Sequence, residues 1–162
     1  MLCQLQEQFQ RLAPMQVPFA DKCGTVRSSV VRYAGHSVAG HTREVAKKNQ
    51  DSLLMAEHTP THSVLFVCLD GHGEDGDTIS QSIKNEIEKS LFSHPLFASD
   101  VKGALAGVIS QAEKGLFSLS CAQLSGSTLA LALVRGDRLY TANIGDSRIV
   151  LASVPKKCER YG

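Results

Sequence analysis

The chain has 162 residues, of which 43% are hydrophobic and 20% are charged. A chain of this length and composition can bury the core of one domain without disulfides or a structural metal. The formal net charge is only +1, so no strong positive field favours a nucleic acid or an anionic membrane. Trp is absent and aromatic residues make up 6%, which argues against a stacking surface for single strands, and no apolar run is long enough to span a membrane.

The five cysteines are odd in number, far apart and without a C-x-x-C pair. This pattern argues against a disulfide framework and against a cysteine zinc site. Cys68 lies in an apolar run, so we expect a buried thiol that behaves as a small hydrophobic side chain. We therefore expect a reducing, intracellular compartment, either the cytoplasm or the nucleus.

The N-terminal region, residues 1–22, is rich in Gln and carries two prolines, which indicates a lead segment. One domain is expected to follow over residues 23–162. A run with several β-branched residues predicts a strand over 25–33, and a second, shorter strand is expected over 52–56.

The clearest strand covers residues 63–69, which are apolar on both faces and are therefore expected to lie inside a layered structure. A loop with three glycines in eight residues follows at 70–77. The next helix is expected to be capped by Asp77 or Thr78 and ended by Pro95. Its apolar stripe at i, i+4 spacing consists of Ile79, Ile83, Ile87 and Leu91.

A second helix is expected to be capped by Asp100. Its apolar stripe consists of Val101, Leu105, Val108, Ile109, Ala112 and Leu116. Strands over 128–134 and 138–143, joined by a tight turn, and a third strand over 147–152 then predict an antiparallel meander.

Three consecutive residues, Asp70, Gly71 and His72, carry the clearest chemical signal. A carboxylate directly after a buried strand is rigidly held, and glycine leaves its carbonyl open, so both oxygens suit a hard cation such as Mg²⁺ or Mn²⁺. A metal ion and a neighbouring imidazole together activate water and protonate a leaving oxygen. The residues alone leave open a second interpretation, a polar turn in which Asp70 caps the loop and His72 is solvated.

Four segments, in order, carry a resemblance to a known family: K-N-Q-D-S at 48–52, L-D-G-H-G at 69–73, S-G-S-T at 125–128 and A-N-I-G-D-S-R at 142–148. Together they resemble the metal-dependent protein serine/threonine phosphatases of the PP2C (PPM) type, over roughly residues 25–155. The resemblance implies an α+β fold, an α-β-β-α sandwich of two antiparallel sheets flanked by helices. It also implies a centre of two Mg²⁺ or Mn²⁺ ions at one end and phosphoserine or phosphothreonine proteins as substrates.

The resemblance also implies roles for individual residues. Asp70 would bridge both ions, the Gly71 carbonyl would bind one of them, and Asp51 would reach a metal partly through water. Asp146 matches an aspartate linked to a weaker third metal ion. His72 would be the general acid, and water activated by the metals would attack phosphorus without a phosphoenzyme.

Two positions depart from the pattern of the family. Many members carry Glu-Asp where this chain has Gln50 and Asp51, although the Gln form also occurs in active branches. Those members also have an arginine that grips the phosphate in the region of Ala46. A solvated loop is one interpretation of the nearby basic residues, and a substitute phosphate site is the other; they are Arg43, Lys47 and Lys48.

Two further aspartate motifs of the family, a D-G and a G-x-x-D-N, do not occur before Gly162. We therefore expect the N-terminal part of a catalytic domain, apparently truncated, that has little activity on its own and exposes apolar surface. The alternative is a catalytically inactive relative that regulates or binds a partner. The segment at 125–128 is expected to be a structural turn, because no base accompanies its serines.

Overall fold

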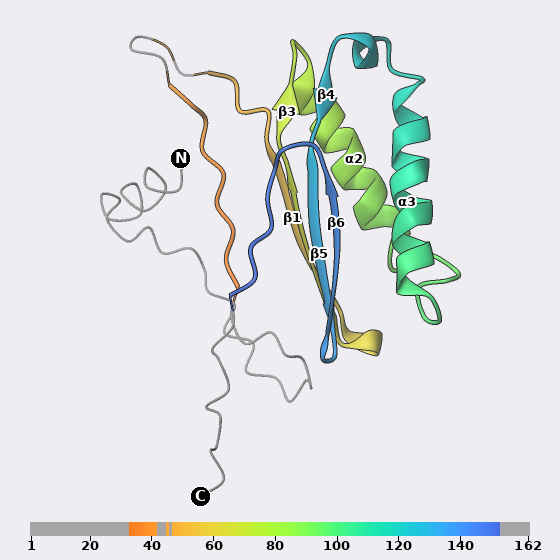
Figure 1. Ribbon diagram of the computed structural model, residues 1–162. Coiled ribbons are helices and arrows are strands. Elements are labelled where there is room, and N and C mark those ends of the chain that lie inside the picture. The colour runs from red at the N-terminus through yellow and green to blue at the C-terminus, as the bar shows by residue number, and fades with distance from the viewer. Residues whose placement is uncertain (1–32, 42–44, 46, 153–162) are drawn as a thin grey trace, which may run out of the picture.

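Strand pairing between distant parts of the chain organises the fold. The computed structural model describes residues 33–41, 45 and 47–152, and within these residues it contains two α-helices, a four-stranded antiparallel sheet and a two-stranded sheet (Figure 1). The elements in chain order are β1 (Ser52–His58), η1 (Thr59–Thr61), β2 (Ser63–Leu69), β3 (Gly71–His72), α2 (Gly76–Ser90), α3 (Val101–Leu116), η2 (Ser120–Gln123), β4 (Gly126–Ser127), β5 (Leu129–Arg135) and β6 (Arg138–Ile144). The expected lead segment and nearly all of the strand expected over 25–33 lie outside the described residues.

The large sheet has the strand order β1-β2-β5-β6, and its register sets which side chains form the core. Leu54 pairs with Val67, and Val67 pairs with Leu131, so these three side chains share one face. Because side chains alternate along a strand, every second residue of β2 and β5 joins them. The buried sheet residues of this core are Leu54, Leu65, Val67, Leu69, Leu129, Leu131 and Leu133.

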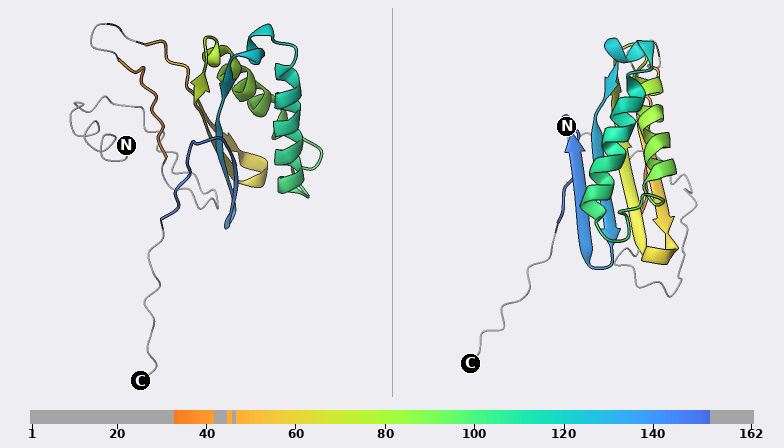
Figure 2. Two further views of the ribbon diagram at one scale, coloured as in Figure 1. Left: turned by 45° about the horizontal axis from the view of Figure 1, so that its top comes forward. Right: turned by 90° about the vertical axis from the view of Figure 1, so that its right-hand side faces the viewer.

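Helices α2 and α3 lie on this same face of the sheet, as Figure 2 shows. In α2 the predicted apolar stripe is confirmed, since Ile79, Ile87 and Leu91 are buried. The predicted cap is wrong, because α2 begins at Gly76 with Asp75 as its N-cap residue. The Asp75 backbone N–H donates to Ser125 Oγ at 3.0 Å, so a hydroxyl from a distant segment stabilises the start of the helix.

The second helix, α3, follows the prediction closely. Asp100 is its N-cap residue, and Asp100 Oδ1 accepts a hydrogen bond from the Gly103 N–H at 3.0 Å. The stripe packs against α2 and the sheet, with Val101, Leu105 and Val108 buried in the core. No helix within the described residues is long and apolar enough to cross a membrane.

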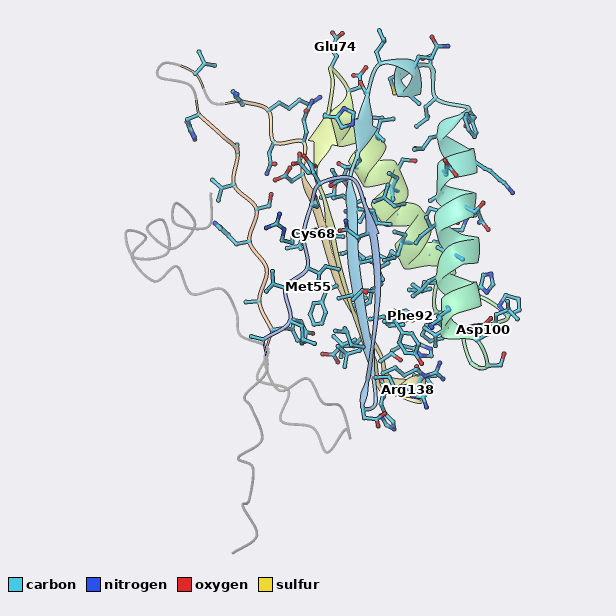
Figure 3. The ribbon with its side chains drawn as sticks, in the orientation of Figure 1. Met55, Cys68, Glu74, Phe92, Asp100 and Arg138 are labelled. Atoms are coloured by element: carbon cyan, nitrogen blue, oxygen red, sulfur yellow. The ribbon has the colours of Figure 1, made fainter. Side chains whose placement is uncertain are left out.

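The described residues cover the opposite face of the sheet only in part. Residues 33–41 and 145–152 lie on this side, away from the helices (Figures 1 and 2). Tyr33 contributes an edge-on ring contact with Phe66, at 5.3 Å between centroids. Met55 and Cys68 nevertheless remain exposed here (Figure 3). The prediction that Cys68 is buried is therefore wrong, because the helices cover only one of the two apolar faces of β2.

The strand predicted over residues 147–152 is also absent from the described structure. Gly145 has φ +86°, a left-handed conformation that glycine adopts easily, and it turns the chain away from the sheet after Ile144. Val150 and Leu151 are 74% and 76% exposed. This apolar, β-branched stretch has the right composition for a strand, but strand formation also requires a ladder partner.

Candidate metal centre

Two carboxylates meet where β1 begins and β2 ends. Ser52 pairs with Leu69, so Asp51, just before β1, and Asp70, just after β2, lie at the same end of the strand pair. The pKa of Asp51 is raised, mainly by burial. The negative charge of Asp70 and a hydrogen bond to the Asp70 carboxyl group raise it further. Two facing carboxylates repel each other until a proton or a cation lies between them.

This pair fits part of the coordination shell of a hard cation, which prefers carboxylate and carbonyl oxygens. Within the described part of the chain, no group of three or more His, Cys, Asp or Glu side chains is arranged to hold a metal ion. Asp51 and Asp70 come together, therefore, without Asp146 as a third ligand. Further oxygens have to come from backbone carbonyls, from water or from other parts of the protein.

The backbone around Asp70 is held by Thr128, which stands just before β5. The Asp70 N–H donates to Thr128 Oγ1 at 3.1 Å, and the Thr128 N–H donates to the Asp70 carbonyl at 2.9 Å. Thr128 Oγ1 lies 2.6 Å from Ser147 Oγ, which extends the link to the loop that carries Asp146. Thr128 therefore connects three of the four motif segments, those at 69–73, 125–128 and 142–148.

Close backbone packing fixes the loop after Asp70. A Cβ atom on Gly71 would lie 2.3 Å from the Gly76 carbonyl oxygen and 2.5 Å from the Gln50 carbonyl oxygen. Real Cβ atoms do not come so close to backbone oxygens, so only glycine fits. The loop is thus clamped between the residue before Asp51 and the start of α2.

His72 lies in the small sheet, where it pairs with Gly126. A Cβ atom on Gly126 would lie 2.7 Å from His72 Nε2, so the imidazole packs directly over this glycine. The His72 side chain is exposed, so solvent or a bound molecule can reach its imidazole. A turn was predicted for residues 125–128, but the two central residues form strand β4 (Gly126–Ser127). The flanking Ser125 and Thr128 side chains bind backbone N–H groups on either side of His72, those of Asp75 and Asp70.

The basic residues considered for phosphate binding differ in their surroundings. Lys48 Nζ forms an ion pair with Asp77 Oδ1 at 2.7 Å, which raises the pKa of Lys48 and lowers the pKa of Asp77. The Lys47 side chain is exposed, while its backbone N–H donates to the Gly40 carbonyl at 2.7 Å. Arg43 lies outside the described residues. Of the two described lysines, Lys48 already has an anionic partner.

Asp146 is exposed in the loop that follows β6. It lines an open cleft of about 650 Å³ between the outward side chains of β6 and the residues after Gly145. Asn143 and Arg148 share this cleft with it. Within the described part of the chain, the hydrogen bonds of Ser147 and Thr128 connect the segment of Asp146 to the segment of Asp70.

Gln50 and Thr128 lie at the site, although their positions in the sequence motifs did not indicate a functional role. Gln50 Nε2 donates to the backbone carbonyls of Gly73 and Glu74, and Glu74 stands at the tip of the loop after His72 (Figure 3). The signal was present in the sequence, since both residues lie inside the conspicuous segments at 48–52 and 125–128. Their contacts span 23 and 58 residues, which no local pattern reveals.

Comparison with known proteins identifies the family. The model of the protein phosphatase 2C family matches residues 32–157, and the chain therefore belongs to this family. It is 40% identical over 87 residues to "Probable protein phosphatase 2C 11" and 38% identical over 89 residues to "Probable protein phosphatase 2C 71", both from Arabidopsis thaliana. These matches cover 52% and 54% of this chain but only 23% and 20% of the relatives.

Solved structures give the same result for the fold. The catalytic domain of the serine/threonine protein phosphatase PstP, in complex with two manganese ions, matches with a TM-score of 0.57 and 25% identity. The match covers 72% of this chain and 49% of that domain. The Ser-Thr phosphatase MsPP from Mycobacterium smegmatis, in complex with cacodylate, matches at 28% identity with a TM-score of 0.50 and covers 69% of this chain and 44% of that one. The predicted α+β phosphatase fold is confirmed, and the chain spans about half the length of these structures.

Proposed function

We propose that residues 23–162 supply part of the catalytic centre of a metal-dependent protein serine/threonine phosphatase, with residues 1–22 as a lead segment. The observation that carries this proposal is the facing pair Asp51 and Asp70, with His72 on the loop that leaves Asp70. Family membership and the similarity to PstP support the same assignment. The substrates would be proteins that carry phosphoserine or phosphothreonine, in the cytoplasm or the nucleus.

Mg²⁺ or Mn²⁺ would be held by the carboxylates of Asp51 and Asp70 and by the Gly71 carbonyl, and Asp146 would serve a weaker third site. When bound, such ions act as Lewis acids toward the phosphoryl group and lower the pKa of water. The Asp51 and Asp70 side chains would bind the metal ions and orient them. The hydrogen bonds between Thr128 and the Asp70 backbone keep Asp70 in place.

His72 would hold the proton that the departing serine or threonine oxygen requires. The backbone on both sides of His72 is closely packed, which limits the positions that the imidazole can take. The imidazole itself remains exposed, so a substrate can reach it. Lys47 and Arg43 would attract the substrate phosphate. Lys48 would contribute less, because it is already paired with Asp77.

Two measurements test the proposal. Titration calorimetry should show weak Mn²⁺ binding by the wild-type chain and a clear loss in Asp70→Ala, and equal binding by both would overturn the metal assignment. The full-length product of the gene should hydrolyse a phosphothreonine peptide with Mn²⁺, and Asp70→Asn should abolish this activity. Phosphate release that is unchanged by Asp70→Asn would refute the catalytic role, and metal binding without turnover would favour the inactive regulatory alternative.

A further inference from the structure

Glu74 lies next to the proposed general acid, at the tip of the loop between β3 and α2. It follows His72 after a single glycine, it is exposed, and its side chain projects outward from the tip (Figure 3). Consecutive Cα atoms are about 3.8 Å apart, so the Cα atom of Glu74 is at most about 7.6 Å from that of His72. The carboxylate is therefore within reach of a residue that neighbours the phosphorylated residue of a bound protein.

The backbone that carries Glu74 is held in place on two sides. Gln50 Nε2 donates to the Gly73 carbonyl at 2.7 Å and to the Glu74 carbonyl at 3.3 Å. On the other side, a Cβ atom on Gly73 would lie 2.5 Å from the Leu124 carbonyl oxygen, so the loop packs against the segment after η2. A side chain on such a fixed backbone loses less conformational entropy when it binds a ligand.

The three carboxylates of this region differ in how accessible they are to a cation from another molecule. Asp77 Oδ1 is paired with Lys48 Nζ at 2.7 Å. Asp75 is partly buried as the N-cap residue of α2. Within the part of the chain that the structure describes, the Glu74 carboxylate takes part in neither an ion pair nor a hydrogen bond. Glu74 is therefore the carboxylate of this loop that is available to a basic side chain.

An exposed leucine lies on the other side of Gly73. The Leu124 side chain is 89% exposed, although its backbone is fixed by the hydrogen bond from its N–H to the Cys121 carbonyl at 3.3 Å and by the packing of its own carbonyl against Gly73. Contact with an apolar side chain of a bound molecule would remove this surface from water. We call Glu74 and Leu124 together the recognition rim.

We propose that the recognition rim selects phosphoprotein substrates that carry a lysine or arginine close to the phosphorylated residue and an apolar residue beside it, a role that rests on the proposed function. The Glu74 carboxylate attracts a basic residue and repels an acidic residue at the same place, so selectivity has both an attractive and a repulsive part. An exposed ion pair typically changes an equilibrium constant about two- to fivefold. Because attraction is replaced by repulsion, the basic substrate should be preferred over the acidic one about tenfold.

Phosphothreonine peptides that differ at one position test the role of Glu74. Lys, Ala or Glu is placed two residues before or two residues after the phosphothreonine, and kcat/KM is measured with Mn²⁺ for the full-length wild type, Glu74→Gln and Glu74→Lys. Glu88→Gln is the matched control, because it removes the same charge from an exposed position about 18 Å along α2 from its start. p-Nitrophenyl phosphate has no flanking residues and therefore reports any general loss of activity.

We expect the wild type and Glu88→Gln to prefer the Lys peptide over the Glu peptide about tenfold, Glu74→Gln to lose most of this preference and Glu74→Lys to reverse it. The preference should shrink as the salt concentration rises, and the turnover of p-nitrophenyl phosphate should be the same in all four proteins. Equal rates of the wild type on both peptides, or an unchanged preference in Glu74→Lys, would overturn the inference and leave the proposed function intact. A full-length protein that hydrolyses neither the peptides nor p-nitrophenyl phosphate would refute the proposed function and this inference with it.

Leu124→Ser tests the apolar part of the recognition rim. Peptides with Leu or Ala directly beside the phosphothreonine are compared, and the wild type should prefer the Leu peptide several-fold because the contact buries apolar surface. Leu124→Ser should lose this preference and keep the wild-type turnover of p-nitrophenyl phosphate. The same preference for Leu in both proteins would overturn the assignment of Leu124 to the recognition rim.

Discussion

Thr128 binds both backbone polar groups of Asp70, with its hydroxyl oxygen as acceptor at 3.1 Å and its own N–H as donor at 2.9 Å. Thr128 Oγ1 also forms a hydrogen bond of 2.6 Å with Ser147 Oγ, in which either hydroxyl can be the donor. The residue is 8% exposed, so water does not readily replace these partners. One side chain therefore connects the segment of Asp70 with the segment of Asp146.

Thr128→Val keeps the shape of the side chain and removes the hydroxyl. The Asp70 N–H then loses its partner in a nearly buried place, so we expect a loss of about 1–3 kcal/mol in the free energy of unfolding. Thr128→Ser keeps the hydroxyl and should lose less. Urea unfolding of the three proteins checks this, and a Thr128→Val protein as stable as the wild type would contradict it.

Asp51→Asn should make the metal-free protein more stable at neutral pH. Burial and Asp70 raise the pKa of Asp51 in the folded protein. The unfolded chain has an Asp51 pKa of about 3.9, and the folded protein has a higher one. At pH values between the two, the unfolded chain has lost a proton that the folded protein still holds. Stability therefore falls as the pH rises through this window and stays lower above it. The amide of the Asp51→Asn variant does not titrate, so this loss of stability does not occur.

Thermal melts of both proteins with a chelator test this effect. We expect Asp51→Asn to melt at the higher temperature at pH 7 and the gap to close toward pH 4. A gap of the same size at both pH values would show that the charge of Asp51 is not its cause. The same variant should bind Mn²⁺ more weakly, because one carboxylate ligand is lost.

Gly126→Ala should displace the His72 imidazole without disturbing the carboxylate pair of Asp51 and Asp70. The added methyl group would lie 2.7 Å from Nε2, and the exposed ring has room to rotate away. General acid–base catalysis contributes typically about 10²- to 10⁴-fold, so we expect the kcat of the full-length protein to fall at least tenfold while the Kd for Mn²⁺ stays the same. His72→Ala should give a similar loss.

The control for this experiment is Gly115→Ala, where an added Cβ atom meets nothing within 4 Å. This variant should keep the wild-type kcat. Full activity in Gly126→Ala would show that the position of the imidazole over this glycine does not matter for the reaction.

Lys47→Met and Lys48→Met should differ in their effect on substrate binding. Lys48 is paired with Asp77, whereas the Lys47 side chain is exposed. We expect Lys47→Met to raise the KM for a phosphothreonine peptide several-fold, and Lys48→Met to change it little. A larger effect of Lys48→Met would mean that the ion pair opens to bind the phosphate.

The exposed apolar residues near the end of the described chain should promote self-association. Val150 and Leu151 are 74% and 76% exposed, and Ile144 is 51% exposed at the end of β6. Large exposed apolar patches and open strand edges favour contacts between molecules. Light scattering after gel filtration should show oligomers that the double variant Val150→Lys, Leu151→Lys reduces, and a monomer at all concentrations would count against this.

The sequence by itself determined the features that depend on neighbouring residues. The apolar run at 63–69, the stripe with Ile79 and Ile87 and the cap at Asp100 correspond to β2, α2 and α3, because burial periodicity and capping are local properties. The order of four motifs likewise identified the family that the comparison confirmed.

Only the tertiary structure decided the rest. Both faces of β2 are apolar, and the position of the helices decides that Leu65 is buried and Cys68 is exposed. Residues 147–152 have strand composition, but a strand exists only where another strand offers its backbone groups. The bonds of Gln50 to Gly73 and of Thr128 to Asp70 form between segments that the sequence separates by 23 and 58 residues. Such contacts arise when the folded sheet brings strand ends together. The sequence motifs therefore contain Gln50 and Thr128 but do not show which groups these residues bind.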